Sequence, residues 1–124
     1  MGKRVGQLVG ARLGRALLEL GGNNAVIVSN KGNLQNALRA VVFGNVGTCG
    51  QRCTSTRRVI IHSEVYDQFK SMLINAYKQV KIGSPLDEAN HMGPLIDKQA
   101  VDAYLGAIKE LENQGGRVVS VVKY

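Results

Sequence analysis

Two short, unbroken apolar runs constrain the fold of this chain more than any other feature. Residues 25–28 read Ala-Val-Ile-Val, and residues 59–61, directly after Arg58, read Val-Ile-Ile. Runs of this kind are typical of strands in a sheet that is covered on both faces. The segment between them is long enough for the crossover, usually helical, that joins two parallel strands. The sequence therefore predicts the α/β class, with a parallel-type sheet flanked by helices.

Apolar residues at helical spacing predict the helices around these strands. A loose stripe with basic residues opposite predicts a helix over 5–18. A second stripe begins at Leu34, where Asn33 is a candidate N-cap, and it predicts a helix that breaks in the glycine-rich stretch 44–50.

Two further helices and a third strand are expected in the second half of the chain. Ser63 is a candidate N-cap for a helix whose apolar face extends to Val80. A last amphipathic helix over 101–111 is closed by the glycines at 115 and 116, and residues 117–122 then predict a third strand.

Length and composition favour a single globular domain. The chain has 124 residues, of which 44% are hydrophobic and 20% charged, so disorder is not expected. No apolar run approaches the roughly 20 residues that cross a bilayer, and we expect a cytoplasmic protein without a membrane partner. The net charge of +7 comes from dispersed basic residues, and six aromatic residues supply few stacking platforms. Solvated basic faces are therefore favoured over a nucleic-acid binder, which stays an alternative.

The two cysteines, Cys49 and Cys53, are poor evidence for a disulfide framework. His62 and His91 lie at no recognisable ligand spacing, so no metal site is expected. Cys53 follows a glycine-rich loop, which can leave its thiol exposed and backbone N–H groups free for an oxyanion. The adjacent Arg52 would favour a thiolate if its head group came close. From these features alone a small buried packing residue stays the commoner alternative.

Glu19 is the second candidate for chemistry. It stands between Leu18 and Leu20, directly before the glycines at 21 and 22. Burial against apolar neighbours suits a glutamate to act as a general base that activates water. A glutamate that points into solvent is an equally good interpretation. The glycines at 44, 47 and 50 do not form the G-x-G-x-x-G dinucleotide motif, and no phosphate-binding loop is recognisable.

Taken together, Leu-Glu-Leu-Gly-Gly at 18–22 and Gly-Gln-Arg-Cys-Thr at 50–54 resemble the two active-site motifs of the aldehyde dehydrogenase superfamily. The 34 residues from Glu19 to Cys53 also match the interval between base and nucleophile in that family. The likeness continues through 57–59, 83–85 and 92–96, and it is strongest to the antiquitin branch, the α-aminoadipic semialdehyde dehydrogenases of lysine breakdown.

The resemblance implies an NAD(P)-dependent oxidation of an aldehyde, such as a semialdehyde, to a carboxylic acid. Cys53 would be the nucleophile that forms a thiohemiacetal and then a thioester, and Glu19 the base that activates water. Leu20 and Gly21 would lie beside the nicotinamide of NAD or NADP. Arg52 and Thr54 would contact the substrate, although Arg52 is equally well interpreted as a structural arginine.

The resemblance also implies a larger assembly. Residues 1–18 correspond to the tail end of a dinucleotide-binding domain, and 19–124 to the first part of a catalytic domain. Full-length members are homo-oligomers with several hundred residues, so this chain is expected to be incomplete and inactive alone. The alternative is a non-catalytic remnant that docks on full-length relatives through exposed strand edges. Cys49 stands where relatives commonly have a small apolar residue, and it is expected to pack rather than to compete with Cys53.

Overall fold

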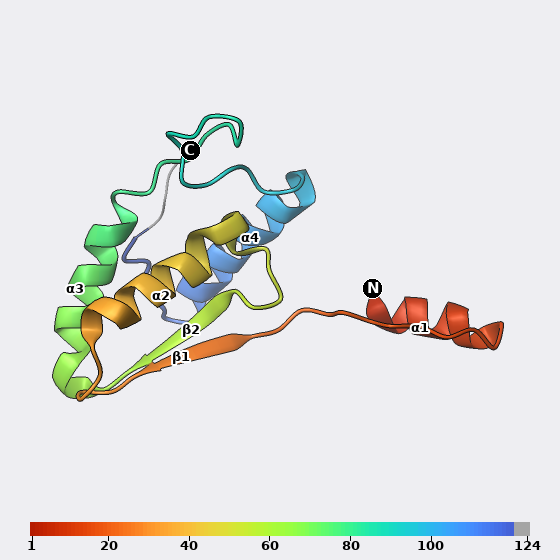
Figure 1. The fold of residues 1–124 in the computed structure, drawn as a ribbon, viewed down its shortest axis with the longest axis horizontal. Helices are drawn as coiled ribbons and strands as arrows, with labels where there is room; N and C mark the ends of the chain where they lie inside the picture. The colour runs from red at the N-terminus through yellow and green to blue at the C-terminus, as the bar shows by residue number, and fades with distance from the viewer. Residues whose placement is uncertain (121–124) are drawn as a thin grey trace.

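The computed structural model describes residues 1–120, and its centre is one β-α-β unit (Figure 1). Strand β1 (Asn24–Val28) pairs in parallel with strand β2 (Thr56–Ile61), and helix α2 (Leu34–Val46) crosses over between them. Helix α3 (Tyr66–Tyr77) follows β2 and packs beside α2. The predicted α/β class and the parallel pairing of the two apolar runs are confirmed.

The core lies on one face of the two strands. Val28, Val41 and Phe69 are its buried members, one each from β1, α2 and α3. The opposite face of the sheet carries Ile27 and Ile60, which are register partners and are 77% and 54% exposed. The apolar runs predict strands covered on both faces, and the described residues cover one of them.

Helix α2 begins where the sequence predicts it. The Asn33 side chain accepts a hydrogen bond from the Asn36 N–H at 3.0 Å, so Asn33 is the N-cap. The helix ends at Val46 and passes into a short 3-10 segment, η1 (Gly47–Gly50). The predicted break in the glycine-rich stretch is therefore confirmed.

The start of α3 differs from the prediction. Ser63 is not its cap: the residue before α3 is Val65, without a side-chain cap bond, and His62 caps the preceding turn, where its Nδ1 accepts the Glu64 N–H at 3.3 Å. Residues Ser63–Val65 form a 3-10 turn, η2, so the α-helix itself begins at Tyr66. The imidazole can reach the free N–H groups of the first turn, and it takes the place of the hydroxyl.

The N-terminal helix is shorter than predicted. Helix α1 (Gly2–Ala11) ends because Leu13 adopts a left-handed conformation with φ 57°, while the Gly14 N–H bonds back to the Val9 carbonyl at 2.9 Å. The predicted helix up to residue 18 is thus wrong beyond Ala11. The chain continues as an extended segment to β1, and α1 stands at the end of it, away from the core (Figure 1).

The C-terminal helix α4 (Lys98–Asn113) is closed as the glycines predict. Gly115 has φ 83°, and the Gly116 N–H donates to the Leu111 carbonyl at 2.9 Å. No strand follows over 117–120, so that part of the predicted third strand is wrong, and its residues 121 and 122 lie outside the described residues. Residues 117–119 do not pair with an edge of the two-stranded sheet; Arg117 and Val119 instead line a pocket together with residues of β2 and α3.

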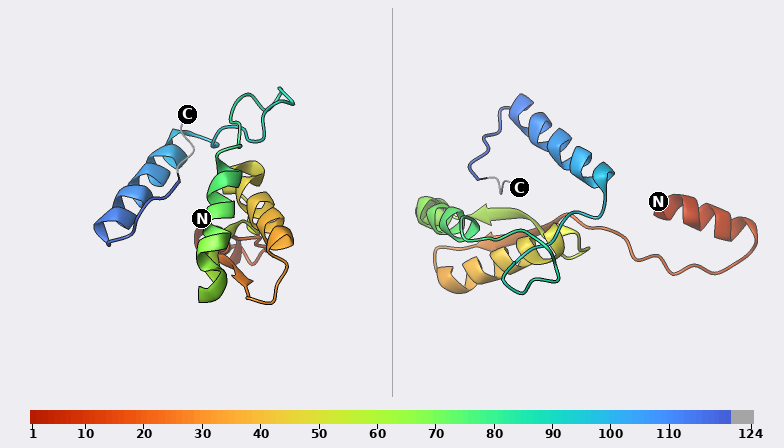
Figure 2. Two further views of the ribbon diagram at one scale, coloured as in Figure 1. Left: turned by 90° about the vertical axis from the view of Figure 1, so that its left-hand side faces the viewer. Right: turned by 90° about the horizontal axis from the view of Figure 1, so that it is seen from above.

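Much apolar surface stays uncovered. Figure 2 shows α4 set apart from the pair α2 and α3, and its Leu105 is 58% exposed. Within residues 1–120 no helix combines the length and the apolar character that crossing a membrane requires.

The two phenylalanines of the chain offer a matched test of this core. Phe69 is fully buried and Phe43 is 71% exposed. We expect Phe69→Ala to lower the free energy of unfolding by about 3–5 kcal/mol, because it leaves a cavity where the two helices meet the sheet. Phe43→Ala should cost much less. Urea unfolding followed by circular dichroism measures both, and equal losses would contradict the assignment of the core.

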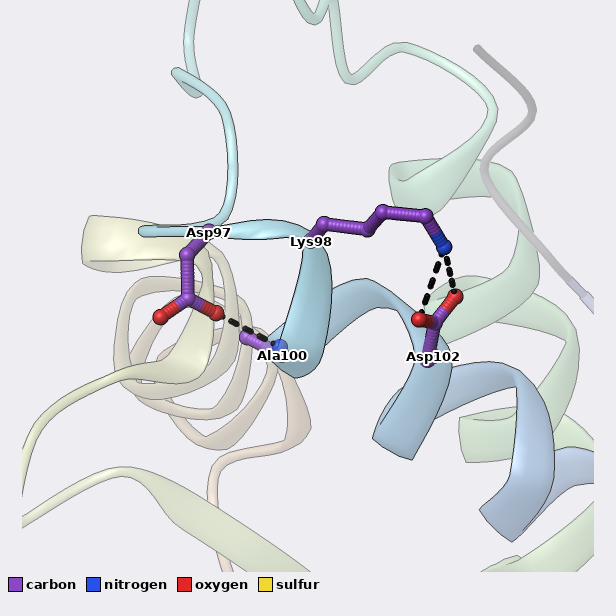
Figure 3. A network of polar contacts seen from close by, with 4 residues as sticks. All are labelled: Asp97, Lys98, Ala100 and Asp102. Atoms are coloured by element: carbon purple, nitrogen blue, oxygen red, sulfur yellow. Dashed lines mark hydrogen bonds and ion pairs between the residues drawn. The ribbon is translucent and has the colours of Figure 1, made fainter.

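The start of α4 provides a second test (Figure 3). The Asp97 carboxylate accepts the Ala100 N–H at 2.7 Å, and Lys98 pairs with Asp102 at 2.8 Å on the exposed surface. We expect Asp97→Ala to destabilise the first turn by about 1 kcal/mol, because a capped N–H loses its acceptor. Lys98→Ala should have a smaller effect, since exposed ion pairs contribute little. Amide hydrogen exchange along Lys98–Asn113 measures both, and a larger effect of Lys98→Ala would refute this ranking.

Candidate active site

Cys53 lies at the corner of a tight turn that leads into β2. The Ser55 N–H donates to the Arg52 carbonyl at 3.1 Å, which closes the turn. In return, the Arg52 N–H donates to Ser55 Oγ at 3.0 Å. Ser55 is 1% exposed, whereas Cys53 is exposed. The turn therefore buries its last residue and presents the thiol to solvent.

A side chain from β1 holds this turn from the other side. The Asn24 amide nitrogen donates to the Cys53 carbonyl at 2.6 Å and to the Ser55 carbonyl at 3.1 Å. Asn24 is the first residue of β1 and its register partner is Thr56, the first residue of β2. The pairing of β1 with β2 thus places the Asn24 side-chain amide at the turn.

The Cys53 N–H has no hydrogen-bond partner within residues 1–120. The N–H of the second residue in such a turn points away from the closing hydrogen bond. An unpaired N–H beside an exposed thiol is the arrangement that stabilises an oxyanion formed on the carbon that the sulfur attacks.

Glu19 lies in the extended segment that enters β1, and it is exposed. Its neighbours Leu18 and Leu20 turn to α1, where they lie against Gly6 and Gly2. Of the two interpretations of Glu19, burial between leucines and a side chain in solvent, the described residues show the second. The leucines instead hold the segment against α1 and leave the carboxylate in solvent.

The two motifs meet at Gly22. This residue lies against the Cys53 carbonyl, which a β-carbon at position 22 would approach to 3.0 Å. Three residues of extended chain span at most about 11 Å, so the Cα of Glu19 lies within about 11 Å of the Cα of Gly22. The structure thus brings the segment of the predicted base to the turn of the predicted nucleophile.

Arg52 is turned toward the end of α2. Its guanidinium donates to the Phe43 carbonyl at 3.0 Å and stacks over the Phe43 ring, 5.0 Å from the centroid. Gly47 lies against the same guanidinium, and a side chain there would displace it. These contacts support the structural interpretation of Arg52. Thr54 is exposed beside Cys53, and a substrate contact by either residue stays a prediction.

The glycine-rich stretch shapes the approach to the turn. Thr48, Cys49 and Gly50 adopt left-handed φ angles of 53°, 55° and 67° in succession. Two of these residues carry a β-carbon, and each such residue costs roughly 1–2 kcal/mol in this conformation. This glycine-rich stretch is not a dinucleotide motif. Its conformation instead helps to hold Arg52 and Cys53 in place.

Contacts with the loop 93–96 hold this unfavourable stretch in place. Gln51 Oε1 accepts the Ile96 N–H at 3.0 Å, and Gln51 Nε2 donates to the Thr48 carbonyl at 3.0 Å. The Cys49 thiol donates to the Gly93 carbonyl at 2.7 Å. Cys49 is therefore engaged in packing, as expected.

The predicted cofactor residues leave room for a flat ring. Leu20 is 57% exposed, and a β-carbon on Gly21 would meet no atom within 4 Å. This open backbone fits one side of a nicotinamide, whereas the sequence offers no recognisable loop for the phosphates. Within the described part of the chain, no three His, Cys, Asp or Glu side chains gather as a metal site would require.

Asn24 and Ser55 are the contributions that the sequence analysis missed. Both are small polar residues next to the motifs, and their importance depends on the strand register. The signals that would have indicated them are a polar residue directly before the apolar run of β1 and a small hydroxyl residue two positions after the candidate nucleophile.

A sequence profile of the "Aldehyde dehydrogenase family" matches residues 1–122. The chain belongs to this family. It is 50% identical to a "Putative aldehyde dehydrogenase family 7 member A1 homolog" of Caenorhabditis elegans, over 95% of this chain and 23% of that protein. It is 44% identical to the "Alpha-aminoadipic semialdehyde dehydrogenase" of Bos taurus, over 96% of this chain and 22% of that protein. The chain thus spans less than a quarter of the length of these aldehyde dehydrogenases.

Solved structures show the same fold. An Escherichia coli "NADP dependent enzyme" matches with a TM-score of 0.90 and 31% identity, over 96% of this chain and 25% of that one. The betaine aldehyde dehydrogenase of Staphylococcus aureus in complex with NAD+ matches with a TM-score of 0.91 over 96% of this chain and 24% of that one; at 24% identity this likeness concerns the fold alone.

Burial raises the pKa of the Cys49 thiol above its ordinary value. A raised pKa means that the neutral thiol persists at neutral pH, so fewer reactive thiolates form. We expect iodoacetamide to modify Cys49 at pH 7 more slowly in the folded chain than in urea, with a rate that rises beyond pH 8.5. Peptide mass spectrometry across a pH series measures this rate. A folded Cys49 that reacts as fast as the unfolded one would show that its environment is not formed.

Proposed function

We propose that this chain supplies the nucleophile Cys53 and the general base Glu19 for NAD(P)-dependent oxidation of an aldehyde to a carboxylic acid. The observation that supports it most is the turn at Cys53: an exposed thiol beside an unpaired N–H, with the Glu19 segment against the same turn. Family membership supports the reaction class.

The residues would act in two stages. The Cys53 thiolate attacks the carbonyl carbon of the aldehyde, and the Cys53 N–H stabilises the oxyanion of the thiohemiacetal. NAD or NADP, when bound, accepts the hydride that leaves this carbon. The acyl group is then held on Cys53 as a thioester. Glu19 takes a proton from water, the resulting hydroxide attacks the thioester, and the acid and the Cys53 thiolate are released.

The cofactor would lie with its nicotinamide against Leu20 and Gly21, where the backbone is open. The name of one solved relative at 31% identity, an NADP dependent enzyme, supports use of a nicotinamide dinucleotide. Phosphate binding would come from residues other than those described here. We therefore expect the isolated chain to lack dinucleotide-dependent turnover.

A semialdehyde is the proposed substrate, because the similar bovine protein is named for α-aminoadipic semialdehyde. Arg52 and Thr54 stay proposed substrate contacts. Assignment of residues 1–18 to a dinucleotide-binding domain and of 19–124 to a catalytic domain is likewise part of the proposal. So are a homo-oligomeric state and a cytoplasmic location.

A second candidate function is a non-catalytic chain that docks on full-length relatives. The exposed pair Ile27 and Ile60 and the uncovered face of α4 favour it, because large apolar surfaces mark contact sites. Size-exclusion chromatography of the chain mixed with a full-length relative tests this candidate, which predicts that the two elute together. Elution of the chain as a separate compact monomer would contradict the docking.

The chemistry of Cys53 can be tested without a dinucleotide. p-Nitrophenyl acetate acylates a nucleophilic thiol, with release of nitrophenolate and formation of a thioester. We expect a burst of about one nitrophenolate per chain, with the acetyl group on Cys53 in the peptide mass spectrum. Cys53→Ser should abolish the burst, whereas Cys49→Ser should retain it.

The same experiment tests the base. Glu19→Gln should leave the burst intact and slow the loss of the acetyl group by about tenfold or more, because water then has no base. Acetylation that falls equally on both cysteines, or deacylation that is unchanged in Glu19→Gln, would refute the assigned roles. Dinucleotide-dependent aldehyde oxidation by the isolated chain, abolished in Cys53→Ser, would refute its expected inactivity.

A further inference from the structure

We propose that Asn24 and Ser55 are positioning residues for Cys53: together they fix the turn so that the Cys53 thiol faces the carbonyl carbon while the Cys53 N–H faces its oxygen. The inference rests on the proposed function of Cys53 as the nucleophile. Both residues lie outside the two family motifs, and the inference assigns them a role in the acylation step.

The turn at Cys53 needs support beyond its closing hydrogen bond. One main-chain hydrogen bond, from Ser55 N–H to the Arg52 carbonyl, closes it, and roughly a third to a half of such turns lack even this bond. Ser55 Oγ adds a second bond by accepting the Arg52 N–H at 3.0 Å. Because Ser55 is 1% exposed, water competes poorly for this hydroxyl.

Asn24 constrains the turn at two further carbonyls. One amide nitrogen donates to the carbonyls of Cys53 at 2.6 Å and of Ser55 at 3.1 Å. These two bonds fix the peptide planes that follow Cys53 and Ser55. The Cys53 carbonyl is thereby turned toward β1, and the side of the turn that carries the thiol stays free.

An irregular strand register brings Asn24 to this position. Asn24 pairs with Thr56 but Ala25 pairs with Arg58, so β2 holds one extra residue at its start. Such irregularities re-aim side chains and recur next to active sites. The Arg58 guanidinium donates to the Asn23 carbonyl at 2.8 Å and so fixes the backbone just before Asn24.

The consequence for the reaction is geometric. An oxyanion donor acts when it lies about 2.7–3.1 Å from the oxygen that becomes charged. A displacement of about 1 Å can cost roughly a hundredfold in rate. Loss of the Asn24 or Ser55 contacts frees the Cys53 N–H to move relative to the thiol, which slows attack on a carbonyl but leaves the thiol accessible.

Asn24→Asp tests this inference, because it keeps the side-chain shape and replaces the N–H donors with a carboxylate oxygen. Asn23→Asp is the matched control, since Asn23 contributes its backbone carbonyl to the contact with Arg58. Two rates at Cys53 are compared: acylation by p-nitrophenyl acetate, which forms an oxyanion, and alkylation by iodoacetamide, which does not. Their ratio removes any effect of the new charge on the thiolate.

We expect Asn24→Asp to lower the ratio of acylation to alkylation by about tenfold or more, and Asn23→Asp to change it less than about twofold. Amide exchange of Arg52 and Ser55, the two N–H groups bonded within the turn, should accelerate in Asn24→Asp alone. Circular dichroism confirms that each variant keeps its helices.

Substitution of Ser55 tests the inference independently, and a conservative replacement that keeps the hydroxyl is its control. Ser55→Val removes the hydroxyl, and Ser55→Thr has nearly the same shape but keeps it. The ratio should fall in the valine variant and be retained in the threonine variant. An unchanged ratio in Asn24→Asp and in Ser55→Val, with acylation of the parent chain intact, would overturn the positioning role alone. A parent chain that is not acylated at Cys53 would overturn the proposed function itself, and the positioning role with it.

Discussion

The parallel pairing of β1 with β2 is the constraint on which the rest of this structure depends. It aligns the starts of two segments that are far apart in sequence, so that Asn24 meets the turn of Cys53 and Gly22 lies against its carbonyl. Helix α2 makes the pairing possible as the crossover, and Val41 covers the inner face of the strands. The contacts that join the Glu19 segment to the Cys53 side of the structure, at Gly22 and Asn23, follow directly from this pairing.

A second layer of support surrounds the turn. The left-handed conformations of Thr48 and Cys49 are unfavourable by themselves, and contacts to the loop 93–96 offset them. Arg52 lies between Gly47 and the Phe43 ring and ties the turn to the end of α2. Family motifs that look like isolated signatures in the sequence are thus parts of one hydrogen-bonded unit. The positioning roles proposed for Asn24 and Ser55 belong to this unit.

The apolar runs and the helical periodicity predicted the two strands, α2, α3 and α4, because these features depend on local patterns and on burial of one face. Several details depend on tertiary contacts instead. Helix α1 stops at Ala11 because Leu13 turns into a left-handed conformation and the Gly14 N–H bonds back to the Val9 carbonyl. The predicted cap Ser63 lies inside the 3-10 turn before α3, which His62 caps. The sequence motifs predicted the roles of Cys53 and Glu19. The roles of Asn24 and Ser55 are evident only from the register in which β1 pairs with β2.

One measurement tests most directly whether this chain by itself brings its two motifs together. A nitroxide attached to Cys53, in a Cys49→Ala background, broadens the amide resonances of nearby residues. The structure predicts strong broadening from Glu19 to Asn24, whereas Asp67, beyond the far end of β2 and roughly 20 Å along the strand, keeps most of its intensity. Equal intensities for Glu19 and Asp67 would contradict the account, because the segment of the base would then not lie beside the nucleophile.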